Sequence, residues 1–280
     1  MRFDISPEPR LFGDSVRAAV GDWEPVREPE LASWLDDRDD ELAARLAAVG
    51  WHELWAGDDL GAIVAGGLEL GRAVAPICLV DEATLGGPLA LDGRIRHGLE
   101  TETCAAPAAG WSLSFQHPTG KRRHQQTLDG TGTVVASIEH ANALDPHDAD
   151  ERWNAWTAAT LAYLAGLAAA AFDAAVAHAR SREQFGRALS AMPAVQARLA
   201  DAALLVDGLE LTAWQAAEPT GFSRAPALLW AGSACRDVTA SAHQVHGAIG
   251  FALEMGLHRY FRRAKAVQVW ATAVSRAARS

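Results

Sequence analysis

The sequence predicts a mainly α-helical protein in which two helical regions flank a short β-rich one. Apolar residues at intervals of three and four mark one helix face in residues 31–49, and four long helical segments follow residue 150. Between these regions the chain contains Gly, Pro, His and Thr with short alternating runs, a pattern typical of strands. We therefore expect an N-terminal helical domain (1–88), a reduced β-rich middle region (89–149) and a C-terminal four-helix bundle (150–280).

Charge and composition narrow the class of protein. The net charge of −10 excludes a nucleic-acid binder, because a phosphate footprint needs a basic surface. The N-terminal run MRFDISPEPRLFGD carries charges throughout, so we expect no signal peptide, and the three scattered cysteines indicate reduced thiols. Residues 156–172 are uncharged but rich in Ala and Thr, which favours a buried bundle helix over a membrane span. A cytoplasmic protein is expected.

Several boundaries can be placed from local signals. The helix over Leu31 to Val49 should stop at Gly50, and Asp58 and Asp59 can cap a second helix that reaches about Ala73. The Asp129-Gly130 pair predicts a hairpin in a middle region too short for a substantial barrel. The bundle helices are expected over 151–182, 192–217, 222–245 and 253–276.

Most standard catalytic motifs are absent from the sequence. There is no G-x-G-x-x-G after a strand, no G-x-S-x-G, no P-loop and no H-E-x-x-H. His243 and His246 lie three residues apart, but no Cys or carboxylate is spaced to join them, so we expect no metal site. Two stretches stand out instead: residues 179–201 and residues 243–270. Taken singly, the first is a charged helix end, and the second is a tight corner in which Gly247 and Gly250 allow positive φ or close backbone approach.

Together, these stretches resemble the acyl-CoA dehydrogenase family. The family's R-x-x-F-G turn is matched by Arg182, Phe185 and Gly186. Its VQ-x-x-LAD helix is matched by Val195, Gln196, Leu199, Ala200 and Asp201. Its Q-x-x-G-G-x-G-[FY] turn is matched by Gln244, Gly247, Gly250 and Phe251, with Ala248 in place of the second Gly. The N-terminal part also resembles the family through an E-x-G-R element, Glu69, Gly71 and Arg72.

The resemblance implies that one side of an FAD site is intact. In this family FAD lies across a subunit interface, and the turn Arg neutralises its pyrophosphate by paired hydrogen bonds, a role that falls to Arg182. Phe185 would pack against the flavin nucleotide, and Gln244 would approach the adenosine-diphosphate part beside the glycine backbone. The implied cofactor-binding residues are Arg182, Gln184, Phe185, Gln244, Gly247, Ala248 and Gly250.

The other side of the flavin site is deficient by the same comparison. Family members cradle the flavin ring with a β-domain of greater length, which carries a Thr-Glu-x-x-x-Gly-Ser element and a Trp-x-x-Asn element. Neither element is recognisable here, and residues 99–110 (LETETCAAPAAG) are at best a remnant of the first.

The catalytic base is missing as well. Family tails read R-D-A-K-x-x-x-I-Y-E-G-T, and the Glu removes the α-proton of the acyl-CoA. Alignment of FRRAKAVQVWATA on this pattern places Ala271 at the Glu and Arg263 at the Asp. Some relatives carry the Glu on the first bundle helix instead, which corresponds to a site near Trp156. Removal of an α-proton needs a base within reach, and neither position has one.

These features imply the non-catalytic subunit of an α2β2 acyl-CoA dehydrogenase of the kind found in actinobacteria. A homologous catalytic subunit would supply the Glu, most of the flavin pocket and most of the acyl-CoA site, and it would share the FAD. The substrate class would be the thioester of a steroid side chain or another bulky acid. Two alternatives stay open: a self-sufficient flavoenzyme, either a dehydrogenase with an unusual base such as Glu151 or a flavin monooxygenase, and a flavin-free scaffolding protein.

Overall fold

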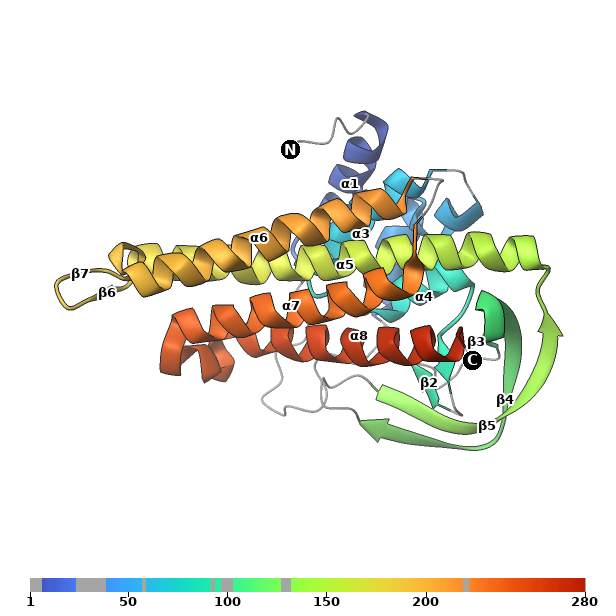
Figure 1. The fold of residues 1–280 in the computed structure, drawn as a ribbon. Helices are drawn as coiled ribbons and strands as arrows, with labels where there is room; N and C mark the ends of the chain where they lie inside the picture. Colours follow the sequence, from blue (N-terminus) through green and yellow to red (C-terminus); the bar gives the residue numbers. More distant parts are fainter. Residues whose placement is uncertain are drawn as a thin grey trace.

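The computed structural model describes residues 7–23, 39–56, 59–91, 94–96, 103–126, 132–218 and 222–279 of the chain (Figure 1). The fold is mainly α-helical, as predicted. The first four helices are α1 (Pro7–Val20), α2 (Asp40–Ala48), α3 (Leu60–Arg72) and α4 (Cys78–Leu85). The bundle helices are α5 (Pro146–Ser181), α6 (Pro193–Ala216), α7 (Arg224–His246) and α8 (Leu257–Ala277).

Side-chain caps fix where several helices begin. The carboxylate of Asp59 accepts a hydrogen bond from Ala62 N at 3.1 Å and starts α3, as predicted. Asp39 accepts from Leu42 N at 2.9 Å and starts α2. Asp39 is extended (φ −81°, ψ 105°), so the prediction of one helix through residues 31–49 is wrong at this position. The part of that prediction over residues 31–38 lies outside the described residues.

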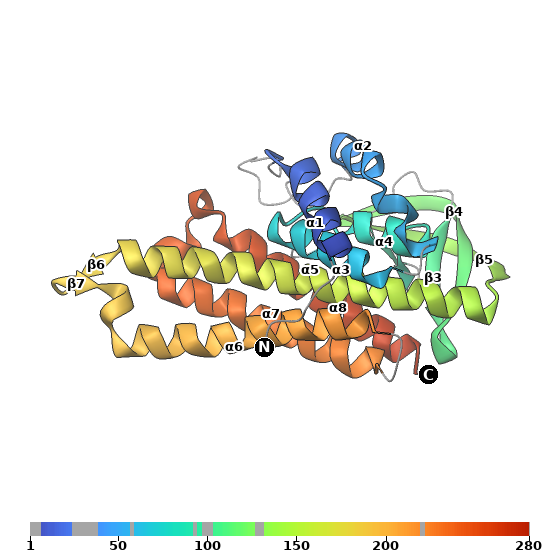
Figure 2. The same cartoon turned by 90° about the horizontal axis from the view of Figure 1, so that it is seen from above.

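Helix α5 is the central element of the bundle. Figures 1 and 2 show it running the length of the molecule between the N-terminal helices and the remaining bundle helices. By length and composition this helix could cross a membrane, but 72% of its apolar window is buried inside the protein. The buried side chains include Trp153, Trp156 and Tyr163, whose hydroxyl donates to Ala75 O at 2.6 Å. The helix is therefore the core of the bundle.

The middle region forms a small antiparallel sheet at one end of the bundle (Figure 1). Its strands are β1 (Ala90–Leu91), β2 (Arg94–Arg96), β3 (Cys104–Ala108), β4 (Ser112–Gln126) and β5 (Gly132–Ala143), in the order β1-β2-β5-β4-β3. β4 and β5 pair from Ser114↔Ala143 to Gln126↔Gly132, which is the predicted hairpin, although Asp129-Gly130 lies outside the described residues. A bridge between Leu89 and Ala105 brings the two outer strands together.

Helices α3 and α5 cross with their backbones in contact. A Cβ atom on Gly71 would overlap the carbonyl oxygen of Tyr163, and one on Gly166 would overlap the carbonyl oxygen of Leu68. Only glycine fits at either position, which explains the Gly in the E-x-G-R element. The neighbouring Glu69 accepts two hydrogen bonds from Arg17 at 2.9 and 2.8 Å, so the same element also holds α1.

We expect Gly166→Ala to lower the free energy of unfolding by about 3 kcal/mol, because the new methyl group must push two helix backbones apart. Urea unfolding measures this loss. Gly208→Ala is the matched control: its Cβ would lie 3.0 Å from the ring edge of the half-exposed Trp230, which can move. The control should be neutral or stabilising by up to about 1 kcal/mol. Equal effects of the two substitutions would contradict a backbone contact at Gly166.

Candidate functional site

The predicted cofactor-binding residues gather at the end of the bundle away from the sheet. Figure 1 shows the β6–β7 hairpin, which follows α5, at the same end of the molecule as the connection between α7 and α8. A small apolar cluster joins these segments, with Ala175 and Ala179 from α5, Val245 from α7 and Leu257 from α8. The two sequence stretches that carry the resemblance are therefore neighbours in space.

The R-x-x-F-G turn is a two-stranded hairpin, which the sequence did not predict. Strands β6 (Glu183–Gln184) and β7 (Arg187–Ala188) pair, and Leu189 N donates to Arg182 O at 2.9 Å to close the hairpin at its base. Phe185 (φ 52°) and Gly186 (φ 74°) both have positive φ at the tip, as the favoured two-residue hairpin turn requires. Arg182 and Gln184 are exposed on this hairpin.

Phe185, at the tip of the hairpin, has a strained backbone conformation and an exposed side chain. A bulky residue at positive φ is a conformational outlier, and its side chain is 90% exposed to solvent. Neither feature stabilises the isolated chain: the backbone is strained, and a large aromatic ring stays in water. Such outliers cluster where a ligand or a partner makes use of them. The hairpin tip is therefore a candidate for contact with a ligand or another chain.

The VQ-x-x-LAD segment, at the start of α6, stabilises the region next to the hairpin. Val195 and Leu199, on the first turns of α6, pack against the apolar cluster at the bundle end. Gln196 donates from Nε2 to Ser190 O at 2.9 Å, which fixes the short 3₁₀ turn η3 (Leu189–Ala191) between the hairpin and α6. The motif is thus explained by the support that it gives to Arg182 and Phe185.

The turn after α7 shows both features that its glycines predict, a positive φ and a close approach of the backbone. Gly247 (φ 65°, ψ −143°) ends α7 in a conformation restricted to glycine, and the space beside its Cα is open. At Gly250 a Cβ would lie 2.8 Å from the Cβ of His246, so this position needs glycine for close packing. Gln244 and Ala248 are exposed on the same turn.

Two stacked imidazoles join the hairpin to the glycine turn. His178, on the last turn of α5, stacks on His246 at the end of α7, with ring centroids 4.3 Å apart and planes 22° apart. His246 is oriented by donation from Nδ1 to Ala242 O at 2.8 Å. Burial lowers the pKa of His178, and His246 and Arg182 lower it further. The sequence suggests His246 only as a metal ligand and does not predict this pair, because no local pattern links residues 178 and 246.

The chemistry of this end suits a phosphate-bearing aromatic ligand. Residues 182–187 contain two Arg and one Glu, and Arg259, Arg262 and Lys265 follow the glycine turn, in a protein of net charge −10. Exposed apolar side chains stand among these cations, Ile249 (51%) and Phe251 (72%) as well as Phe185. Guanidinium groups can hold phosphates, and aromatic rings can pack on a flat base. The residues present fit the adenosine-diphosphate part of FAD.

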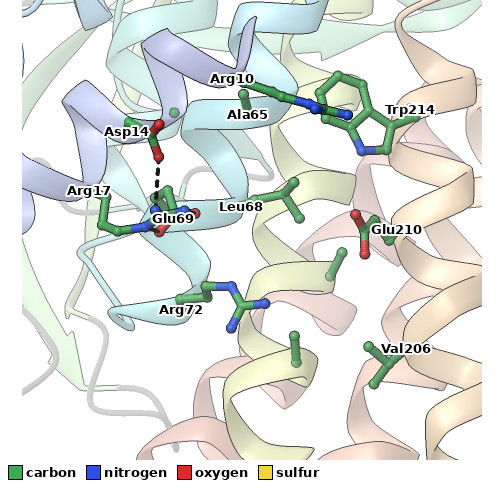
Figure 3. Close-up of a pocket in the computed structure, with 13 residues that line it drawn as sticks. Arg10, Asp14, Arg17, Ala65, Leu68, Glu69, Arg72, Val206, Glu210 and Trp214 are labelled. Carbon is green, nitrogen blue, oxygen red and sulfur yellow. Dashed lines mark hydrogen bonds and ion pairs between the residues drawn. The ribbon is translucent and has the colours of Figure 1, made fainter. Parts of the chain in front are cut away.

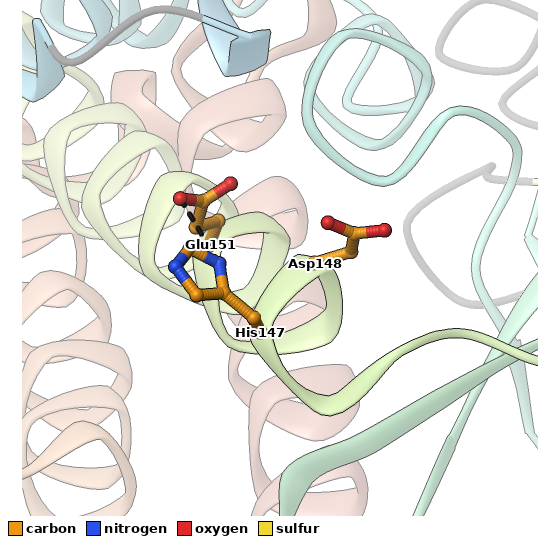
Figure 4. Close-up of side chains that lie close together, drawn as sticks. All are labelled: His147, Asp148 and Glu151. Carbon is orange, nitrogen blue, oxygen red and sulfur yellow. Dashed lines mark ion pairs between the residues drawn. The ribbon is translucent and has the colours of Figure 1, made fainter.

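The positions at which the resemblance places a base are enclosed. Ala271 is 1% exposed on α8, and Trp156 is 0% exposed on α5. Arg263, at the place of the family's Asp, is also buried. Glu151, the alternative base, lies in a surface trio with His147 and Asp148 on the first turns of α5 (Figure 4). Its side chain is 52% exposed, and its carboxylate lies 3.2 Å from His147.

A separate groove of about 490 Å³ lies between α1, α3, α5 and α6 (Figure 3). Small apolar residues form much of its wall, and charged residues face it from both sides. Two of its cations have partners: Arg17 binds Glu69 and Asp14, and Arg72 binds Asp173 at 3.1 Å. The groove contains none of the predicted cofactor-binding residues.

Comparisons with known proteins show which family the bundle resembles. Residues 151–271 match the family model "Acyl-CoA dehydrogenase, C-terminal domain". The bundle is therefore similar to the C-terminal domain of this family over 121 of the 280 residues. Similar curated proteins include 3-sulfinopropanoyl-CoA desulfinase of Paraburkholderia xenovorans, 38% identical over 100 residues, which are 34% of this chain and 26% of the desulfinase. Relatives named acyl-CoA dehydrogenase are 33% to 36% identical over 107 or 108 residues, about a quarter of their length.

Solved structures extend the likeness to the whole chain at the level of the fold. The steroid ACAD Tcur3481-Tcur3483 (G363A variant) superposes with a TM-score of 0.73 at 21% identity, over 94% of this chain and 93% of that one. The ChsE4-ChsE5 complex from Mycobacterium tuberculosis gives 0.70 at 19% identity, over 97% and 95%. The acyl-CoA dehydrogenase fold therefore includes the N-terminal helices and the small sheet, as expected from the sequence.

We expect the free energy of unfolding to decrease as the pH falls from about 6.5 to about 4. Burial lowers the pKa of His258, on the first turn of α8, to about 4, and Arg259, Arg262 and His243 add to the effect. The unfolded chain binds protons at these imidazoles below their ordinary value of 6.5, while the folded chain does not. Stability is therefore full above pH 6.5 and is lost through this window.

Urea unfolding at a series of pH values measures this dependence. A His178→Gln/His258→Gln variant should lose part of the slope between pH 6.5 and 4, because glutamine does not titrate. His147→Gln, at an imidazole that is 77% exposed, is the control and should keep the slope of the wild type. A double variant with the unchanged slope would contradict the account of these two half-buried imidazoles.

Proposed function

We propose that this protein is a subunit of a heteromeric FAD-dependent acyl-CoA dehydrogenase and completes the FAD site of a homologous partner. FAD supplies the two-electron acceptor when bound, and the reaction is the α,β-desaturation of an acyl-CoA. In this proposal Arg182 and Gln184 hold the pyrophosphate, Phe185 packs on the nucleotide, and Gln244 lies with the Gly247, Ala248 and Gly250 backbone against the adenosine.

The observation that carries the proposal is the exposed hairpin tip. Phe185 is strained and 90% exposed, beside an exposed Arg182, on a hairpin whose base is fixed by the bundle. A chain that kept FAD for its own use would also need a β-domain to cover the flavin ring. Here the whole sheet is formed within residues 90–143, and four of its described residues, Ala90, Ile95, Cys104 and Ala106, make a small apolar cluster of their own. The intact contacts thus face outward, toward a flavin held mainly by another chain.

The absence of a base favours a catalytic partner. Ala271 stands at one expected position and Trp156 lies near the other, and neither side chain can accept an α-proton. Two of the similar folds, Tcur3481-Tcur3483 and ChsE4-ChsE5, take their names from pairs of different chains, which supports a heteromeric assembly here. The partner would supply the Glu and most of the acyl-CoA site. A stable interface of this kind buries about 2,000 Å² or more.

We expect Arg182→Ala to remove most of the flavin from the complex without unfolding either chain. The loss of a charge-assisted contact to a buried phosphate costs about 2 to 4 kcal/mol, which weakens FAD binding by roughly 30-fold or more. Arg182→Lys should recover only part, because an ammonium cannot form the paired contact. The measurement is the flavin absorbance per complex after co-purification with a homologous dehydrogenase subunit.

Arg180→Ala is the matched control for this experiment. Arg180 is an exposed Arg two residues earlier on α5, outside the matched motif, so its loss should leave flavin content unchanged. Full flavin occupancy in the Arg182→Ala complex would show that Arg182 is only a charge at the end of α5. It would contradict the proposed contact between this chain and FAD. A chain that binds flavin when purified alone would favour a self-sufficient flavoenzyme. No flavin in either preparation would favour a scaffolding protein.

A further inference from the structure

A buried ion pair lies between the N-terminal helices, the sheet and the bundle. Asp81, on the first turn of α4, and Arg96, on β2, are 0% and 1% exposed. The guanidinium of Arg96 donates from Nε to Asp81 Oδ2 at 2.7 Å and from Nη2 to Asp81 Oδ1. The pair therefore connects a helix and a strand by a two-point contact, out of contact with water.

Two tryptophans of the bundle enclose the pair. Trp156 donates from Nε1 to Asp81 Oδ1 at 2.9 Å, and the ring of Trp270 lies 5.4 Å from the guanidinium carbon of Arg96. Trp156 lies near one of the two positions where the resemblance places a base, and Trp270 directly precedes Ala271 at the other. A tryptophan close in sequence to each vacant base position therefore contacts the ion pair.

We propose that the Asp81–Arg96 pair closes this chain's own acyl site and locks its three regions together. The inference rests on the proposed function, because it assigns the acyl site of the complex to the partner alone. The pair replaces a cleft between the N-terminal helices, the sheet and the bundle by direct contacts among α4, β2, α5 and α8. The chain can then present its hairpin as part of a rigid body, with no substrate to admit.

The geometry distinguishes this role from that of a displaced base. Asp81 is a carboxylate that is hydrogen-bonded to Trp156, near one of the base positions, so it is the obvious substitute for the missing Glu. A general base must come within hydrogen-bond reach of the proton that it removes. Asp81 is fully enclosed, and its oxygens already accept three hydrogen bonds, from Arg96 twice and from Trp156. A buried pair of this kind is strongly destabilised when one partner is removed.

The test is Asp81→Asn in the co-purified complex, with Asp173→Asn, an exposed acid paired to Arg72, as the matched control. We expect the melting temperature of the variant chain to fall by about 10 °C, because Arg96 loses its counter-ion. We expect turnover per intact, flavin-loaded complex to stay within about twofold, measured with octanoyl-CoA and other CoA thioesters well below the melting temperature. Arg96→Met should also lower the melting temperature, and the double variant should lose less than the sum.

Two results would overturn the inference. A drop in turnover of more than about tenfold in Asp81→Asn would make Asp81 a base. An unchanged melting temperature, or additive losses in the Asp81→Asn/Arg96→Met double variant, would show that the pair locks nothing. The melting temperatures are also measured on this chain alone, so they test the stabilising role of the ion pair even if no complex retains flavin. Loss of flavin in every complex would instead count against the proposed function and leave the melting result standing.

Discussion

The close crossing of α3 and α5 is the constraint on which the rest of the structure depends. Gly71 and Gly166 let the two backbones touch, and no other residue leaves room for this contact. The crossing fixes α5 against the N-terminal helices near the middle of a 36-residue helix. Because that helix is continuous, the position of each of its ends is determined together with the crossing. One end lies near the sheet and the other carries the hairpin.

The two ends of α5 have opposite characters. At the first end, Trp153 packs edge-on against Trp111 and Trp156, with centroids 5.6 and 5.4 Å apart, and the Asp81–Arg96 pair lies beyond them. At the other end, the helix finishes in His178 and Arg182 and an exposed Phe185. The first end, where a base would be needed, is filled by buried side chains. The second end, where a nucleotide would lie, is open and cationic. This division is what the proposed role of a supporting subunit requires.

Much of this arrangement could be predicted from the sequence, and the exceptions have physical reasons. Helical periodicity and caps placed the bundle helices within a few residues, for example 193–216 for α6 against the expected 192–217. The close approach at Gly250 was also foreseen. The turn at Arg182 was expected as a simple helix end, but the backbone conformation of Phe185 makes it a hairpin, and no propensity favours Phe at positive φ. The Asp81–Arg96–Trp156 contacts join residues up to 75 positions apart, and no local pattern reports them.

The most direct test of the central claim is the accessibility of the hairpin tip in the assembled complex. The three native cysteines are buried, so Phe185→Cys adds a single exposed thiol for alkylation by iodoacetamide. The rate is compared in the chain alone, in the complex with a homologous dehydrogenase subunit, and in that complex with FAD. If residue 185 contacts a flavin nucleotide held by the partner, the thiol reacts fast in the chain alone and is protected when FAD is bound. Equal rates in all three states would contradict the claim that this chain completes a partner's flavin site.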